Sequence, residues 1–126
     1  MSLPQPTNAE LEILKVLWAG GPQTVRDVHD EIRRRRPVRY TTVLKLLQIM
    51  TEKGLVQRDE SARSHVYGAA VDETAVTSHL VKDLVDRAFE GSAAKLVMQA
   101  LAAKPASPRE LKEIRDLLER MNRRTS

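Results

Sequence analysis

The sequence of 126 residues contains no cysteine, which excludes a disulfide framework and a thiolate metal site. Aromatic residues make up only 3% of it, so the core must consist of aliphatic side chains and methionine, and this favours helices over a sandwich or barrel. A run of about 18 apolar residues, the length needed to span a bilayer, is also missing. The opening MSLPQPTNAE lacks the basic and apolar regions of a secretory signal. We therefore expect a soluble, cytoplasmic, mainly helical protein with no membrane partner.

The sequence also lacks a catalytic constellation. The histidines fall in different predicted elements, at His29, His65 and His79, and His29 is expected on the solvent side of its helix. No HExxH motif, glycine-rich phosphate loop or serine nucleophile motif accompanies them. We predict that the protein is not an enzyme and uses no cofactor and no metal.

Positive charge is concentrated in one part of the chain. The net charge is +4, and residues 33–65 contain nine Lys or Arg against three Asp or Glu. Clustered positive charge suits a polyanion, because displaced counterions drive association with phosphates; a solvated basic face is an equally good interpretation. Within the cluster, the run Arg33–Arg36 lies at a predicted helix end, where the helix dipole favours cations. A structural role for this run is at least as well supported as contact with DNA.

Two helices are predicted in the first part of the chain. Thr7 and Glu10 form a T-x-x-E capping box that begins the first helix, and Gly-Gly-Pro at 20–22 ends it. Thr24 caps the second helix, and Pro37 ends it.

The segment RYTTVLKLLQIMTEKG, residues 39–54, predicts a third helix that stops at Gly54. Two strand-like segments, LVQRDE and HVYGAA, follow and are joined by a polar turn, so residues 55–70 are expected to form a β-hairpin. Three helices followed by a hairpin make the winged form of the helix-turn-helix, whose third helix enters the DNA major groove. Residues 1–71 are therefore predicted to be a winged-helix DNA-binding domain.

One side of the third helix carries polar side chains suited to base edges. Thr41, Lys45 and Gln48 share this side, opposite the apolar residues. Lys suits guanine acceptors, Gln suits adenine, and Thr suits a thymine methyl group or an acceptor. Leu44 lies beside them, and we assign it to the edge of the core in preference to a thymine contact.

Phosphate contacts are expected from the start of this helix and from the hairpin. Backbone N–H groups and the helix dipole already favour an anion at a helix start. Arginines on a hairpin can follow the DNA backbone or enter the minor groove, although such an arginine can equally be solvated. The predicted DNA-binding residues are Arg39, Tyr40, Thr41, Thr42, Lys45, Gln48, Arg58, Arg63 and Ser64.

Residues 72–126 are predicted to form three more helices, each with an apolar stripe. So short a segment lacks the residues for a comfortable core of its own. We therefore expect a helical dimerisation domain that pairs two copies of the chain, in preference to stripes packed within one chain. The predicted dimer contacts are Leu80, Leu84, Val97, Leu101, Leu111, Ile114, Leu118 and Met121.

Five segments together resemble the BlaI/MecI family of penicillinase repressors, whose broader membership includes the copper-responsive CopY repressors. They are TNAELEILKVLW, TVRDVHDEI, YTTVLKLLQIMTEKGLV, ARSHVYGAA and SPRELKEIRDLLER, and they extend over nearly the whole chain. The resemblance implies a winged-helix head and a helical tail that pairs two subunits. It further implies a dimer that binds an imperfect palindrome and blocks transcription.

This chain departs from the family in two ways that concern its inducing signal. Relatives that answer to β-lactams are cleaved, through a membrane sensor-protease pathway, at an Asn-Phe bond in the second tail helix. The aligned position here is Gln99-Ala100. Copper-responsive relatives carry a C-terminal cysteine cluster, and the absence of cysteine excludes copper sensing by that device.

The main alternative to a sequence-specific DNA-binding repressor is a winged helix that binds another protein. Such a module is expected to show apolar or acidic residues on its third helix and wing, whereas this third helix is polar and this hairpin basic. RNA is a weaker candidate partner, because few aromatic residues are present to stack unpaired bases.

Overall fold

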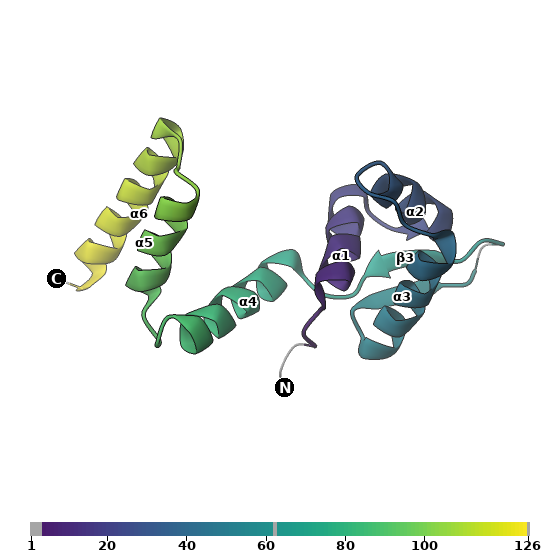
Figure 1. Ribbon diagram of the computed structural model, residues 1–126. Helices are drawn as coiled ribbons and strands as arrows, with labels where there is room; N and C mark the ends of the chain where they lie inside the picture. Colours follow the sequence, from purple (N-terminus) through teal and green to yellow (C-terminus); the bar gives the residue numbers. More distant parts are fainter. Residues whose placement is uncertain (1–3, 62, 126) are drawn as a thin grey trace. The chain divides into compact units, whose positions relative to one another are not determined.

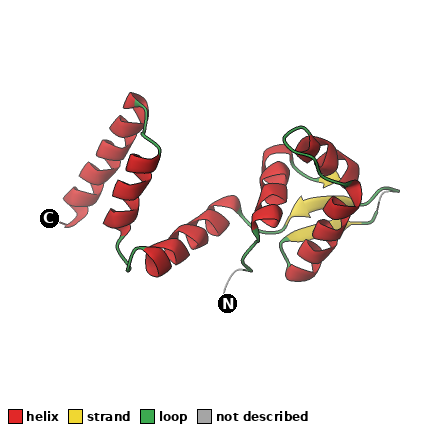
Figure 2. Cartoon of the chain, in the orientation of Figure 1, coloured by secondary structure: helices red, strands yellow, loops and turns green. Residues whose placement is uncertain are grey.

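The computed structural model describes residues 4–61 and 63–125. Contacts divide the chain into two compact units, Met1–Val81 and Lys82–Ser126. The elements in chain order are α1 (Asn8–Gly20), β1 (Gln23–Thr24), α2 (Val25–Arg33), α3 (Tyr40–Lys53), β2 (Val56–Asp59), β3 (Val66–Ala69), α4 (Glu73–Ala88), α5 (Ala93–Ala103) and α6 (Pro108–Thr125), as Figures 1 and 2 show. This order confirms the predicted mainly helical fold, with three helices and a hairpin before a helical tail. The functional division into residues 1–71 and 72–126 stays a prediction.

Local sequence signals set the helix ends of the first unit. In the predicted capping box, the backbone N–H of Thr7 donates to Glu10 Oε1 at 2.8 Å, and that of Glu10 donates to Thr7 Oγ1 at 3.2 Å. The hydroxyl oxygen of Thr24 accepts the backbone N–H of Asp27 at 3.2 Å and caps α2. Gly54 ends α3 with a φ of 81°, a left-handed conformation that glycine adopts without steric cost.

The sheet has one strand more than the predicted hairpin. Strands β2 and β3 form the hairpin, and β1 adds to the other side of β3, which gives the antiparallel order β1-β3-β2 (Figure 2). In β1, Gln23 lies opposite Tyr67 and Thr24 lies opposite Val66. This short strand connects the start of α2 to the end of β3 that lies next to the hairpin turn.

Apolar side chains from the first three helices and the sheet meet in one core. The predicted inner side of α3 is confirmed, since Val43, Leu47 and Met50 are completely buried. Leu44 is half-buried and packs against the core, as expected of a residue at its edge. Each fully buried aliphatic side chain contributes about 1.5–3 kcal/mol to folding, so α3 is held firmly by its inner side. Tyr67 of β3 is also completely covered, with 1% of its surface exposed.

The beginning of α4 belongs to the first unit. The indole N–H of Trp18 donates to the backbone oxygen of Val71 at 3.0 Å, just before the helix begins. Val76, in the first turns of α4, is buried. The first unit therefore extends past the wing and includes the start of the tail.

The second unit contains the end of α4 with α5 and α6. A capping box begins α6, because the backbone N–H of Ser107 donates to Glu110 Oε1 at 2.9 Å and that of Glu110 donates to Ser107 Oγ at 3.1 Å. No residue of α5 or α6 is buried among those that the structure describes. The apolar stripes of these helices remain at least partly open to solvent within one chain.

Candidate nucleic-acid interface

The outer side of α3 presents the predicted base-reading residues. Thr41, Lys45 and Gln48 are all exposed, although the residues between them include fully buried ones. Because the inner side of the helix is packed into the core, the backbone of α3 is rigid where these side chains project. A rigid helix with an outward polar stripe is the geometry that major-groove recognition requires.

Helix α3 is also held at its C-terminal end. Lys53 Nζ lies 2.7 Å from Glu10 Oε1, the same carboxylate oxygen that takes part in the capping box of α1. Burial works to raise the pKa of the Glu10 carboxyl, but the hydrogen bonds from Lys53 and Thr7 outweigh it and hold that pKa below its ordinary value of 4.5. The carboxylate is therefore charged at neutral pH and pairs with Lys53.

The N-terminal end of α3 has a different character. Arg39 occupies the N-cap position and makes no side-chain cap hydrogen bond, unlike Thr7 at the start of α1 and Thr24 at the start of α2. Arg39, Tyr40 and Thr42 are exposed. A helix start with exposed cationic and hydroxyl side chains suits a phosphate group.

A shallow groove of about 320 Å³ brings the start of α3 together with the wing. Tyr40 and Leu44 line it from α3, and Arg63, Ser64 and His65 line it from the hairpin turn. The start of α2 completes it with Thr24, Val25 and Arg26, and Tyr67 forms part of its wall. Of the predicted DNA-binding residues, the groove thus joins Tyr40 of the helix start with Arg63 and Ser64 of the wing; the others lie outside its lining.

Sequence reasoning missed Arg26, which is exposed in the first turn of α2 and lines the same groove. Arg26 lies beside the hairpin turn only because α2 packs near the hairpin, and the sequence does not show this packing. The only local signal was its place in the first turn of α2, two residues after the cap residue Thr24.

Arg58 is turned toward the hairpin itself. Its guanidinium pairs with the carboxylate of Glu60, and hydrogen bonding with the Tyr67 side chain, chiefly, raises the pKa of Arg58 above its ordinary value. Tyr67 lies directly opposite Arg58 in the sheet. Arg58 therefore has partners inside the wing, whereas Arg63 and Ser64 are exposed at its turn.

The arginine run beside α2 is balanced by carboxylates. Arg33 lies 3.8 Å from Asp30, and Arg34 and Arg35 lie 3.1 and 3.7 Å from the two oxygens of Glu31. Arg36 makes a two-pronged contact with Glu12 of α1, with Nη2 2.6 Å and Nε 3.1 Å from the same oxygen.

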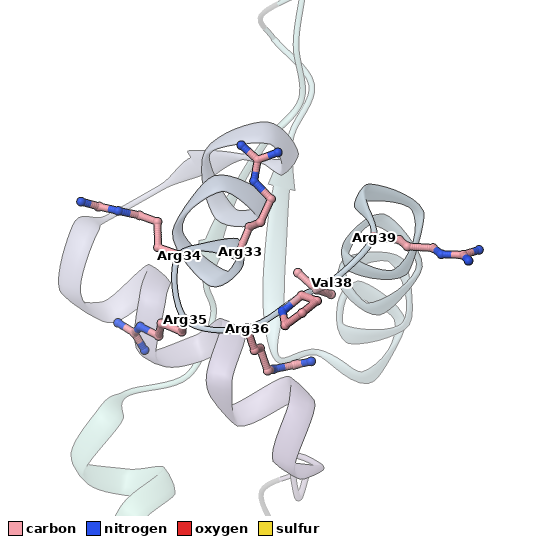
Figure 3. A pocket seen from close by; sticks show the side chains of 7 residues that line it. Arg33, Arg34, Arg35, Arg36, Val38 and Arg39 are labelled. Carbon is pink, nitrogen blue, oxygen red and sulfur yellow. The ribbon is translucent and has the colours of Figure 1, made fainter.

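An open pocket of about 760 Å³ lies along this run, but Figure 3 shows the labelled guanidinium groups pointing in different directions. The groups do not converge on one point. This geometry favours the structural role of the run.

Other kinds of site find no support in residues 4–61 and 63–125. These residues contain no group of three or more His, Cys, Asp or Glu that could hold a metal ion. Within the same residues, no helix is both long and apolar enough to cross a membrane.

Two regulatory proteins share extended sequence similarity with this chain. The penicillinase repressor of Bacillus licheniformis is 25% identical over 117 residues, which cover 93% of this chain and 91% of that protein. The transcriptional regulator BlaI of Mycobacterium tuberculosis is 34% identical over 80 residues, which cover 63% of this chain and 58% of that protein.

A solved structure shares the fold of the first unit. The solution structure of the Bacillus licheniformis BlaI monomeric form, in complex with the blaP half-operator, is 27% identical and superposes with a TM-score of 0.52. The superposition covers 59% of this chain and 90% of that one, and it confirms the winged-helix fold. The family model described as penicillinase repressor matches residues 6–120, and this family consists of repressors and not of enzymes. Because that match spans nearly the whole sequence, the chain belongs to the penicillinase repressor family.

Proposed function

We propose that this protein represses transcription by binding operator DNA as a homodimer. Helix α3 lies in the major groove, and the hairpin of β2 and β3 serves as the wing. The observation that carries this proposal is the two-sided character of α3, which has fully buried residues on one side and exposed Thr41, Lys45 and Gln48 on the other. The related BlaI, which shares the fold of the first unit, is described in complex with a half-operator.

Base reading is assigned to the exposed stripe of α3. Lys45 can donate to guanine O6 and N7, and Gln48 can exchange two hydrogen bonds with adenine. Thr41 lies one turn before Lys45, where its methyl group can contact a thymine methyl group or its hydroxyl can bond to an acceptor. Each well-placed pair contributes about 1–3 kcal/mol of discrimination against the wrong base.

Phosphate binding is assigned to the groove between the start of α3 and the wing. Within the groove, Tyr40 approaches the DNA backbone from the helix start, and Arg63 and Ser64 approach it from the hairpin turn. Arg39 and Thr42, which are exposed at the helix start but do not line the groove, are assigned to the same backbone. Arg58 supports the wing from within, because Glu60 and Tyr67 already engage its guanidinium. These contacts orient α3 and carry no sequence information themselves.

Dimerisation is assigned to the helical tail. Leu84, Val97, Leu111, Leu118 and Met121 are between 38% and 56% exposed in the single chain, an unusual exposure for large apolar side chains on successive helices. Leu80, Leu101 and Ile114 are half-buried on the same helices. A second copy of the chain that covers these stripes provides the core that one tail lacks.

The test is selection of bound fragments from genomic DNA, followed by footprinting of the strongest ones. Two protected half-sites of inverted sequence are expected, with centres about one helical turn or a multiple of it apart. The proposal is overturned if no double-stranded DNA binds at low ionic strength. Protection of a single, unrepeated half-site would overturn the homodimer on a palindrome while leaving DNA binding intact.

A further inference from the structure

The loop between α2 and α3 is fastened by His29. This residue lies in α2, is half-buried, and has its Nε2 atom 2.8 Å from the backbone oxygen of Val38. Its ring also meets the ring of Tyr40 edge to face, with centroids 5.7 Å apart and planes at 85°. Sequence reasoning placed His29 on the solvent side of its helix, and this was wrong because the loop returns across it.

The start of α3 needs such an anchor. Arg39, at the N-cap, makes no side-chain cap hydrogen bond, although a good cap commonly contributes about 1 kcal/mol. The residues before it form a turn that carries the arginine run and Pro37. The contacts of His29 with Val38 and Tyr40 lie on either side of this uncapped position.

Tyr40 connects this anchor to the candidate interface. It is the first residue of α3, it is 45% exposed, and it lines the groove shared with Arg63 and Ser64. An edge-to-face aromatic contact restricts the ring at little entropic cost, because a tyrosine side chain has few rotatable bonds. A contact that restricts the Tyr40 ring therefore also fixes the part of the groove where the start of α3 meets the wing.

We propose that His29 is a positioning residue for DNA binding, which acts through Val38 and Tyr40 and does not touch DNA itself. The proposal rests on the proposed function, since it assigns Tyr40 to the phosphate backbone. The imidazole fixes the loop and the Tyr40 ring before DNA arrives, so that the hydroxyl group of Tyr40 meets a phosphate without further ordering. Loss of the imidazole costs affinity without removing a charge from the contact with DNA.

The first test needs no DNA. In the full-length protein, ring-proton resonances of Tyr40 are recorded by NMR for the parent, for His29→Ala and for His79→Ala, a matched control on α4. His29→Ala is expected to shift the Tyr40 signals and His79→Ala to leave them unchanged. Unchanged Tyr40 signals in His29→Ala overturn the proposal whether or not the protein binds DNA.

The second test is a double-mutant cycle with a radiolabelled duplex taken from a genomic fragment that the parent binds. His29→Ala is expected to raise Kd about tenfold, and the same change made in Tyr40→Ala to alter Kd less than about twofold. The slope of log K against log salt is expected to stay that of the parent, because no phosphate-neutralising cation is lost. Equal losses in both backgrounds, an unchanged Kd, or a slope lowered by about one unit would each overturn the proposal.

A loosened fold is separated from positioning by thermal melting. If His29→Ala melts about 10 °C or more below the parent, His29→Gln takes its place, because the Gln amide keeps a donor for the Val38 oxygen while removing the ring. The cycle and the salt slope then carry the same expectations and the same contradicting outcomes.

Discussion

The ammonium group of Lys53 lies 2.7 Å from Oε1 of Glu10 and joins the last residue of α3 to the first turn of α1. The Glu10 side chain is only 3% exposed, whereas that of Lys53 is 33% exposed. A nearly buried carboxylate without its cation is costly, so this pair makes the placement of α3 dependent on the ionisation of one residue.

Breaking this pair is expected to destabilise the protein in a pH-dependent way. Lys53→Met should lower the free energy of unfolding by about 2 kcal/mol at neutral pH, because Glu10 keeps its charge and loses its partner. The folded pKa of Glu10 lies below 4.5, so its stabilising contribution is present above that pH and is lost as the pH falls through the lowered pKa. The difference between parent and variant should therefore shrink in acid.

Urea unfolding at fixed protein concentration, at neutral pH and well below pH 4.5, checks this. The matched control is Arg109→Met, which breaks the exposed pair with Glu113 at 3.7 Å and should cost less than about 0.5 kcal/mol. A Lys53→Met effect that is independent of pH would contradict the role given to the Glu10 charge.

Substitutions on the outer stripe of α3 should change sequence preference. Lys45→Ala and Gln48→Ala are each expected to cost about 1–3 kcal/mol on a selected site and to relax preference at one base pair. Glu52→Ala is the control, because Glu52 is exposed on the same helix near its far end. Competition with duplexes changed one base pair at a time measures the effect. If both variants keep the parent's preference at every position, the reading stripe is assigned to the wrong residues.

The wing and the arginine run should differ in their response to salt. Arg63→Ala is expected to weaken binding to all duplexes alike and to lower the salt slope by about one unit, because a phosphate contact is lost. Arg36→Ala removes the same charge, but Arg36 is engaged by Glu12, so its slope should stay close to that of the parent. Titrations over a range of salt concentrations compare the two. Equal slopes for both variants would remove Arg63 from the phosphate contacts.

A polar residue in the apolar stripe of α6 should weaken the dimer. Leu118 is 56% exposed in the single chain. Leu118→Ser should raise the dimer dissociation constant by about a hundredfold or more, because each of the two symmetric subunits loses one apolar side chain from the interface. Glu119→Ser, at the next and also exposed position, should leave it unchanged. Sedimentation equilibrium measures both. A parent protein that sediments as a monomer at micromolar concentration would contradict the role proposed for the tail.

The features that sequence reasoning predicted correctly depend on residues close together in the chain. The capping box of Thr7 with Glu10 is visible in the sequence because it joins residues three positions apart. The buried and exposed sides of α3 follow from helical periodicity alone. Such patterns carry their own geometry, so the order of elements was predictable.

The features that were missed depend on how distant segments meet. Strand β1 has only two residues and exists because β3 lies beside it. Likewise, the partner of Arg36 is Glu12, on another helix, and the partner of His29 is the oxygen of Val38 in a loop. Periodicity carries no information about such contacts, because each requires the finished packing of α1, α2 and the loop.

The hydrogen bond from Trp18 to the backbone oxygen of Val71 gives the protein a built-in optical probe. Trp18 is the sole tryptophan of the sequence, so all of the indole emission comes from one place, where the chain leaves the wing and enters α4. Detachment of this junction would expose the indole to water and shift its emission to longer wavelength. Unlabelled protein thus reports directly on whether the entry to α4 stays docked.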